Sequence, residues 1–140
     1  MAIDPSSVAS SAAIEHLRWS LVPEVGPKRF ARIVERFGSA QEALGASAAQ
    51  LSGIDSVGST LAAAIAKARD EVDLQGEVEL AAKHAVRIIC RDDEEYPPGL
   101  RQMPDAPIVL YVRGRIEAQD AVALAIVGAR RCTTYGREQA

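Results

Sequence analysis

Apolar residues recur every three to four positions through the first 84 residues of the chain, which is the spacing typical of amphipathic helices. This pattern predicts a first helix over residues 12–22, which the segment 23–27, with a proline at each end, would terminate. A second helix is expected from 28 to 37, with Gly38 as its C-terminal stop. Further helices are predicted over 39–44, 47–53 and 59–68, the last continuing or restarting as far as 84. The first 84 residues are therefore predicted to be all-helical.

Short apolar runs replace the helical spacing after residue 84. Residues 86–90 and 108–112 are predicted to be strands, separated by a connector that contains four prolines. The run from 121 to 127 predicts a third strand, apolar enough to be buried on both faces. About eight residues separate the second and third strands, whereas a parallel crossover needs about a dozen or more, so these two strands would be antiparallel or not adjacent.

The C-terminal region holds too few elements to close an α/β domain by itself. We therefore expect a fold of the α plus α/β class in two parts. Residues 1–84 would form a small helical domain, and residues 85–140 would form the incomplete beginning of a domain with a parallel sheet. On this expectation the chain is a fragment, and the rest of the sheet lies beyond Ala140.

The composition is that of a globular protein, with 48% hydrophobic and 25% charged residues. No stretch approaches the roughly 18 apolar residues of a membrane-spanning helix, and residues 1–13 lack the basic start and apolar centre of a signal peptide. We therefore expect a cytoplasmic protein without membrane contact. The net charge of −3 does not indicate a general nucleic-acid binder, but three arginines and no acidic residue lie between Val127 and Arg137.

Two joints between predicted helices share a sequence pattern. Both read Val-Gly-x-x-x-Ala, from Val57 to Ala62 and, with one extra residue, from Val25 to Ala31. The pattern resembles the helix-hairpin-helix motif, in which amides at a helix N-terminus contact a DNA phosphate without reading sequence, and a pair of such motifs is similar to the domains called SAM-like. The residues of this auxiliary DNA site would be Gly26, Lys28, Arg29, Gly58 and Ser59. The alternative is that the glycines only shape tight turns or that this acidic half contacts protein.

The segment from Gly128 to Gly136 follows the third predicted strand and has the composition of a phosphate-binding turn. Free amides and the dipole at a helix N-terminus attract anions, and an arginine holds phosphate with a planar fork of donors. The second glycine of a dinucleotide fingerprint is absent, and so is the Gly-Lys-Ser/Thr of a P-loop. The predicted phosphate-binding residues are Gly128, Ala129, Arg130, Arg131, Thr133, Thr134, Tyr135 and Gly136, with the threonines as helix caps or hydroxyl donors and Tyr135 as a base-stacking residue. The alternative is a basic cap on an ordinary strand-to-helix turn.

Three blocks in this order resemble the DNA-processing protein A family, also called DprA or Smf: Tyr96 to Leu100, Pro107 to Gly114 and Ala125 to Gly136. The family's Gly-Ser-Arg phosphate turn falls on Gly128, Ala129 and Arg130, so an alanine replaces a serine hydroxyl here. The resemblance implies an extended Rossmann-like domain that binds single-stranded DNA, forms a homodimer through a part missing from this chain, and loads the RecA recombinase onto incoming DNA during natural transformation. It implies an accessory protein rather than an enzyme, with no catalytic residue, cofactor or metal.

Two rival interpretations remain open. A Rossmann-like hydrolase of nucleotides or nucleotide sugars would hold a mononucleotide phosphate in the same turn, with Glu138 as the nearby carboxylate that could act as a base. This chain could also be a helical protein-interaction module that binds no DNA. Among the other residues, the acidic run 92–95 is expected to be a solvated loop, Cys90 to lie in the core, and His16 and His84 to lie at the surface or at helix ends without an acidic partner.

Overall fold

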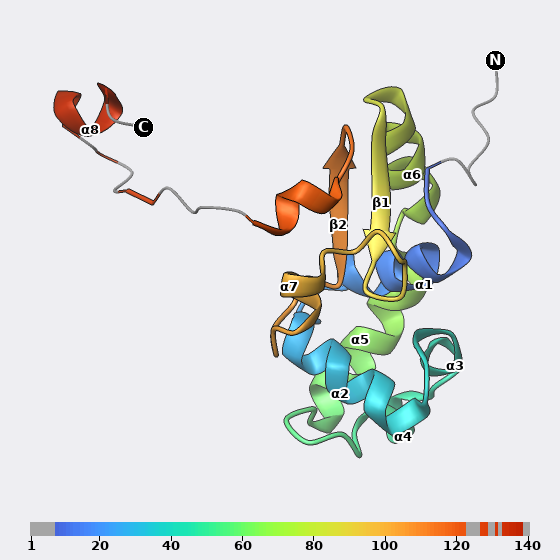
Figure 1. Ribbon diagram of the computed structural model, residues 1–140. Helices are drawn as coiled ribbons and strands as arrows, with labels where there is room; N and C mark the ends of the chain where they lie inside the picture. The colour runs from blue at the N-terminus through green and yellow to red at the C-terminus, as the bar shows by residue number, and fades with distance from the viewer. Residues whose placement is uncertain (1–7, 123–126, 129–130, 132, 139–140) are drawn as a thin grey trace.

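The computed structural model describes residues 8–122, 127–128, 131 and 133–138. Figure 1 shows helices α2 to α5 at one end of the main body and the two strands at the other, with α1 behind the strands and α6 beside β1. In chain order the elements are α1 (Ser11–Ser20), α2 (Pro27–Phe37), α3 (Ala40–Leu44), α4 (Ala48–Leu51), α5 (Ser59–Glu71), α6 (Leu74–Lys83), β1 (Val86–Cys90), α7 (Pro98–Arg101), β2 (Val109–Arg113), a 3-10 helix (Ala118–Ala121) and α8 (Thr134–Glu138).

The helices predicted in the first 84 residues are confirmed, and local capping explains where they begin and end. Gly38 ends α2 with a φ of 96°, a conformation that favours glycine, and its amide donates to the Val34 carbonyl at 2.7 Å. Ser39 caps α3, since its hydroxyl accepts from the Glu42 amide at 3.0 Å. The last predicted helix restarts rather than continues, because Val72 is extended and the Asp73 side chain caps α6.

One hydrophobic core runs from the helices into the sheet. Trp19 of α1 is fully buried and its indole Nε1 donates to the Ala40 carbonyl at 3.0 Å, so α1 is fixed to α3. Helix α1 also packs against both strands, and Ile88 and Cys90 of β1 belong to the same cluster. The division into domains at residues 84 and 85 stays a prediction, because the core is continuous across that point.

The expected parallel sheet is wrong for the two described strands. β1 and β2 pair antiparallel, with Val86 opposite Arg113 and Cys90 opposite Val109. The connector between them holds only the four-residue helix α7, about 6 Å long, in place of the longer helix usual in a parallel crossover. On the other side of β1, the Ile88 amide donates to the Val8 carbonyl at 2.7 Å.

The third predicted strand lies largely outside the described residues, which leave out 123–126. At its ends, Ala121 belongs to the 3-10 helix, and Val122 and Val127 are 93% and 89% exposed. A Rossmann-like arrangement therefore stays a prediction. Helix α8 stands apart from the main body in Figure 1. Within the described ranges, no helix has both the length and the apolar character needed to cross a bilayer.

Candidate functional site

The two helical joints singled out in the sequence form two hairpins of the same backbone geometry. The first joins α1 to α2, and the second joins α4 to α5. Glu24 and Ser56 occupy matching positions, each with a φ of 68°, and each is followed by a buried valine. Gly26 and Gly58 follow as the extended N-cap residues of α2 and α5. The chain thus contains an internal repeat of one turn.

Backbone hydrogen bonds define the alignment of the two hairpins. The Phe30 amide donates to the Gly26 carbonyl at 2.9 Å, and the Ala62 amide donates to the Gly58 carbonyl at 2.8 Å. Phe30, not Ala31, is therefore the counterpart of Ala62, and both are buried. The predicted alignment, with one extra residue in the first joint, is wrong. The two hairpins match in backbone conformation and burial rather than in a shared alanine.

Each hairpin presents the uncapped N-terminus of a helix. No side-chain cap is made to the first amides of α2 or α5 by the residues that the structure describes. Gly26 and Gly58 also face open space, because a side-chain carbon built on either would meet no described atom within 4 Å. Free amides and the positive end of the helix dipole are thus accessible to an anion at both places.

Helix α2 carries a line of cations away from its N-terminus. Lys28, Arg32 and Arg36 are exposed at intervals of four residues, which places them along one side of the helix, and Arg29 is partly buried beside them. A surface hollow of about 490 Å³ lies at this end of α2, with Gly26, Pro27, Lys28, Arg29, Arg32, Ser56 and Asp105 around it. Both hairpins therefore contribute to one hollow.

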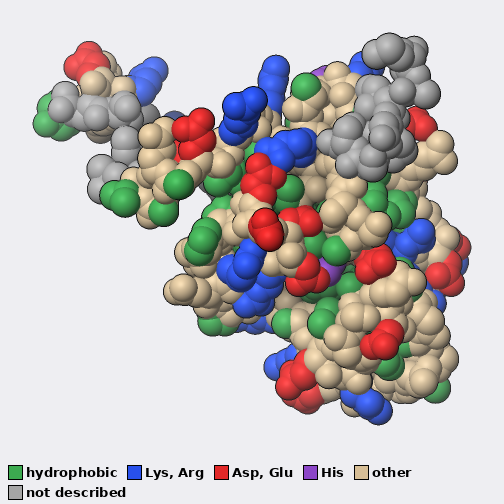
Figure 2. All heavy atoms as spheres, turned by 45° about the vertical axis from the view of Figure 1, so that its right-hand side comes forward, with side chains coloured by type: hydrophobic (Ala, Val, Ile, Leu, Met, Phe, Trp, Pro, Cys, Tyr) green, Lys and Arg blue, Asp and Glu red, His purple; other side chains and the backbone are tan. Residues whose placement is uncertain are grey.

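Acidic groups moderate this positive charge. Arg32 Nη1 lies 3.6 Å from the Asp55 carboxylate and also donates to the Asp55 carbonyl at 3.1 Å. Over the face drawn in Figure 2, the blue Lys and Arg side chains alternate with red Asp and Glu side chains rather than forming one broad patch. The second hairpin, with the exposed Ser59 close to Asp55 in sequence, is thus less favourable for an anion than the first.

Part of the predicted phosphate-binding turn lies within the described residues. Gly136 donates its amide to Thr133 Oγ1 at 3.2 Å, so Thr133 caps α8 and Thr134 begins it. Ala129 and Arg130 lie outside the described residues. Gly128, Arg131, Thr133, Thr134, Tyr135 and Gly136 are all exposed, Tyr135 at 71%. Phosphate binding and the plain basic cap both stay predictions for this turn.

His16 differs from the sequence expectation. The residue is 6% exposed, and Nε2 lies 3.7 Å from the Asp92 carboxylate. The expectation of a surface histidine without an acidic partner was wrong because the partner comes from a turn far along the chain, which no local pattern reveals. His84, by contrast, is exposed at the end of α6 as expected.

Cys90 lies in the core, as expected, at the end of β1 and next to this histidine and carboxylate. Burial raises the pKa of its thiol to about 12, so the sulfur carries its proton at neutral pH. The neighbouring Asp93 supports the turn instead, since its carboxylate accepts from the Cys90 amide at 2.7 Å and from the Ser10 hydroxyl at 2.7 Å. The acidic run is therefore more ordered than a solvated loop.

The chain is similar to known proteins over both parts. Residues 10–73 match the DprA-like N-terminal HHH domain, and residues 87–140 match DNA recombination-mediator protein A. Protein Smf of Synechocystis sp. is 27% identical over 133 residues, which are 92% of this chain and 33% of that protein. The chain thus spans about a third of the length of this relative. No solved structure matches it.

Proposed function

The chain belongs to the DNA-processing protein A family, and we propose that it takes part in DNA recombination by binding single-stranded DNA. It corresponds to the N-terminal portion of the proteins of this family. In the full-length protein this activity would protect incoming DNA and load the RecA recombinase during natural transformation. The protein would act in the cytoplasm as a homodimer, without catalysis and without a cofactor.

The observation that carries this proposal is the repeated hairpin with its open helix N-termini. A phosphate placed before Gly26 would meet the free amides of α2, with Lys28 and Arg29 next to them. Such contacts hold the backbone of DNA and leave the bases unread. The first hairpin supplies most of the charge, and Gly58 and Ser59 of the second supply amides and a hydroxyl.

The turn from Gly128 to Gly136 is the second proposed contact, and the principal one in the full-length protein. Arg130 and Arg131 would hold phosphate with the backbone at Gly128 and Ala129, and Thr133 and Thr134 would cap the helix or donate hydroxyls. Tyr135 is 71% exposed, which leaves its ring free to stack on a base. The hairpins would then be an auxiliary site.

The test is fluorescence anisotropy with a labelled single-stranded oligonucleotide across a salt series. In the double variant Lys28→Ala/Arg36→Ala, both lost cations are exposed on α2. We expect several-fold weaker binding and a decrease of about 1.4 in the slope of log affinity against log salt, from about 0.7 per phosphate contact. The matched control is Lys67→Ala/Lys83→Ala, which removes the same charge from exposed positions on α5 and α6.

Equal affinity in the two double variants would remove the hairpins from the site, and the same measurement on Arg131→Ala would then test the turn alone. Absence of oligonucleotide binding at low salt would favour a protein-interaction module. Tighter binding of free nucleotides than of oligonucleotides would instead favour the nucleotide hydrolase.

A further inference from the structure

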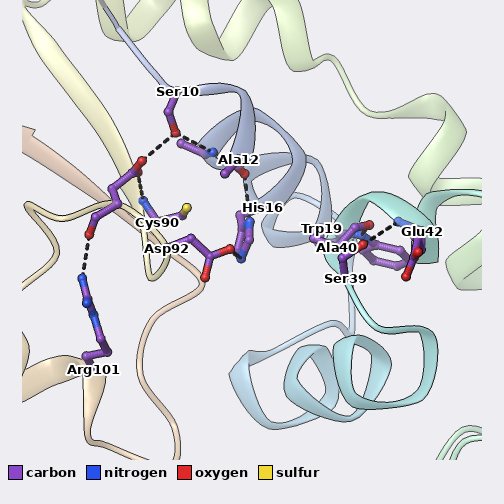
Figure 3. A network of polar contacts seen from close by, with 12 residues as sticks. Ser10, Ala12, His16, Trp19, Ser39, Ala40, Glu42, Cys90, Asp92 and Arg101 are labelled. Carbon is purple, nitrogen blue, oxygen red and sulfur yellow. Dashed lines mark hydrogen bonds and ion pairs between the residues drawn. The ribbon is translucent and has the colours of Figure 1, made fainter.

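A nitrogen, a sulfur and an oxygen donor meet where α1 packs against the end of β1. The donor atoms of His16, Cys90 and Asp92 all lie within 4.8 Å of one another. Figure 3 shows the Cys90 sulfur and the Asp92 carboxylate on the same side, beside the His16 ring. These residues come from the helical part and from the turn after β1, so the cluster joins two parts of the fold.

The orientation of His16 determines which of its nitrogens is available. Nδ1 lies 2.8 Å from the Ala12 carbonyl, which can only accept a hydrogen bond, so Nδ1 carries a proton. In the neutral ring, Nε2 therefore presents its lone pair toward the Asp92 carboxylate 3.7 Å away. Two acceptors facing each other repel unless a cation lies between them. A backbone carbonyl on the other ring nitrogen is also the arrangement that positions metal-binding histidines.

Either a proton on Nε2 or a metal ion would relieve this repulsion. A proton would need only the carboxylate opposite it. Cys90 Sγ adds a third donor, soft and fully buried, at the same place. Mixed nitrogen, sulfur and oxygen donors are the ligand set of zinc-type ions rather than of Mg²⁺ or Ca²⁺.

We propose that His16 Nε2, Cys90 Sγ and Asp92 Oδ2 bind a divalent cation of the zinc type. Tetrahedral bonds of about 2.0 to 2.3 Å require donor separations of about 3.3 to 3.8 Å, so the donors, now within 4.8 Å of one another, need to approach by about 1.5 Å at most. Asp92 is exposed and lies in a turn, which allows this adjustment. On binding, the sulfur–metal bond replaces the S–H bond of Cys90, and that proton passes to solvent.

A fourth coordination position would face a cavity of about 410 Å³ next to the cluster. His16 and Asp92 both line this cavity, and Phe30, Arg91 and Pro107 form other parts of its wall. Water can therefore reach the ion and complete the tetrahedron. Since the three protein ligands come from α1 and from the end of β1, the ion would also hold the helices against the sheet.

The experiment is a titration of the full chain, purified metal-free, with Co²⁺ followed by displacement with Zn²⁺. We expect one Co²⁺ per chain, with the near-ultraviolet absorption of a cobalt–thiolate bond and the visible bands of tetrahedral cobalt. Cys132→Ala, which removes the other cysteine of the chain, should keep the thiolate absorption, and Cys90→Ala should lose it. Absence of thiolate absorption, or its loss in Cys132→Ala instead, would overturn the proposal.

Cys90 is fully buried, and its replacement could disturb folding, so the second variant is Asp92→Asn at an exposed position. Competition against a chromogenic chelator should show zinc affinity at least about tenfold weaker than in the unmodified chain. Glu94→Gln is the matched control, two residues away and also exposed, and should leave the affinity unchanged. Equal affinity in Asp92→Asn and Glu94→Gln would remove Asp92 from the site and overturn the three-residue assignment.

Discussion

Arg32 of α2 donates through Nη1 to the hydroxyl of Ser56 at 2.6 Å, which joins the first hairpin to the second. The same nitrogen donates to the Asp55 carbonyl at 3.1 Å. Arg32, one of the exposed cations along α2, thus also holds the second hairpin in place. The two helix N-termini are therefore positioned relative to each other by a polar side chain as well as by the apolar core.

The strength of the Arg32–Ser56 hydrogen bond can be measured by comparing glycine substitutions at Glu24 and Ser56, the two equivalent positions with a φ of 68°. Glycine at either position relieves a left-handed conformation that costs other residues about 1–2 kcal/mol. Glu24→Gly loses no described partner, whereas Ser56→Gly also loses the Arg32 hydrogen bond. We expect Glu24→Gly to be the more stable of the two by about 0.5–1.5 kcal/mol in urea unfolding. Equal stability would mean that the Arg32–Ser56 bond contributes nothing.

Arg69 is the one lysine or arginine that is buried among the described residues, and its removal should be costly. It donates to the Ala46 carbonyl at 2.9 Å and so fixes the end of α3 to α5. Arg69→Ala would leave this buried carbonyl without its donor and create a void. We expect a loss of at least about 2 kcal/mol in the free energy of unfolding. Lys67→Ala on the same helix is exposed and should cost less than about 0.5 kcal/mol.

Trp19→Phe tests the fixation of α1 to α3. The phenyl ring cannot donate to the Ala40 carbonyl, and it leaves part of a fully buried site empty. We expect a loss of about 2–4 kcal/mol, measured by chemical unfolding. The comparison is Tyr96→Phe, which removes only a hydroxyl that donates to the Pro107 carbonyl at 2.8 Å and should cost about 1 kcal/mol. A smaller loss for Trp19→Phe than for Tyr96→Phe would contradict the central role of the indole.

The Arg87–Glu95 pair should make stability depend on pH in the acid range. The hydrogen bond from Arg87 lowers the pKa of the Glu95 carboxyl below its ordinary value. A carboxyl with a lowered pKa in the folded state stabilises the fold above its unfolded pKa, and this stabilisation is lost as the pH falls through the folded pKa. About a third of each side chain is exposed, so solvent screens the pair and the contribution should be below about 1 kcal/mol.

The measurement is the melting temperature of the unmodified chain and of Glu95→Gln at neutral pH and in acid. The two should differ at neutral pH and converge in acid, where Glu95 is protonated. Glu94→Gln should follow the unmodified chain at every pH, because Glu94 is exposed. A difference between the chain and Glu95→Gln that persisted in acid would show that the carboxylate charge is not the cause.

Features with a local cause could be predicted from the sequence. The bounds of β1, Val86–Cys90, coincide with the predicted strand, because an apolar run between a helix end and an acidic turn marks both of its limits. The cap at Ser39 and the stop at Gly38 were likewise predicted, since each depends on residues three or four positions away. Each of these features depends only on hydrogen bonds and residue spacing within a short segment.

Features that depend on distant partners could not be predicted. The direction of β2 relative to β1 depends on how the connector folds, and the bond from Tyr96 to Pro107 that closes it gives no periodic signal. The same holds for His16 and Asp92, which tertiary packing brings together. The equivalence of Phe30 and Ala62 in the two hairpins could not be predicted either. The two positions have the same backbone hydrogen bond but carry side chains of very different size, a phenyl ring and a methyl group.

The two strands differ in how much of their outer edge is paired. The bond from Ile88 to Val8 and a bridge to Ala9 occupy one side of β1, and β2 occupies the other. Among the described residues, none pairs with the far edge of β2, so its amides and carbonyls form a template for another strand. A further segment or a second molecule could therefore extend this sheet by pairing with residues 109–113.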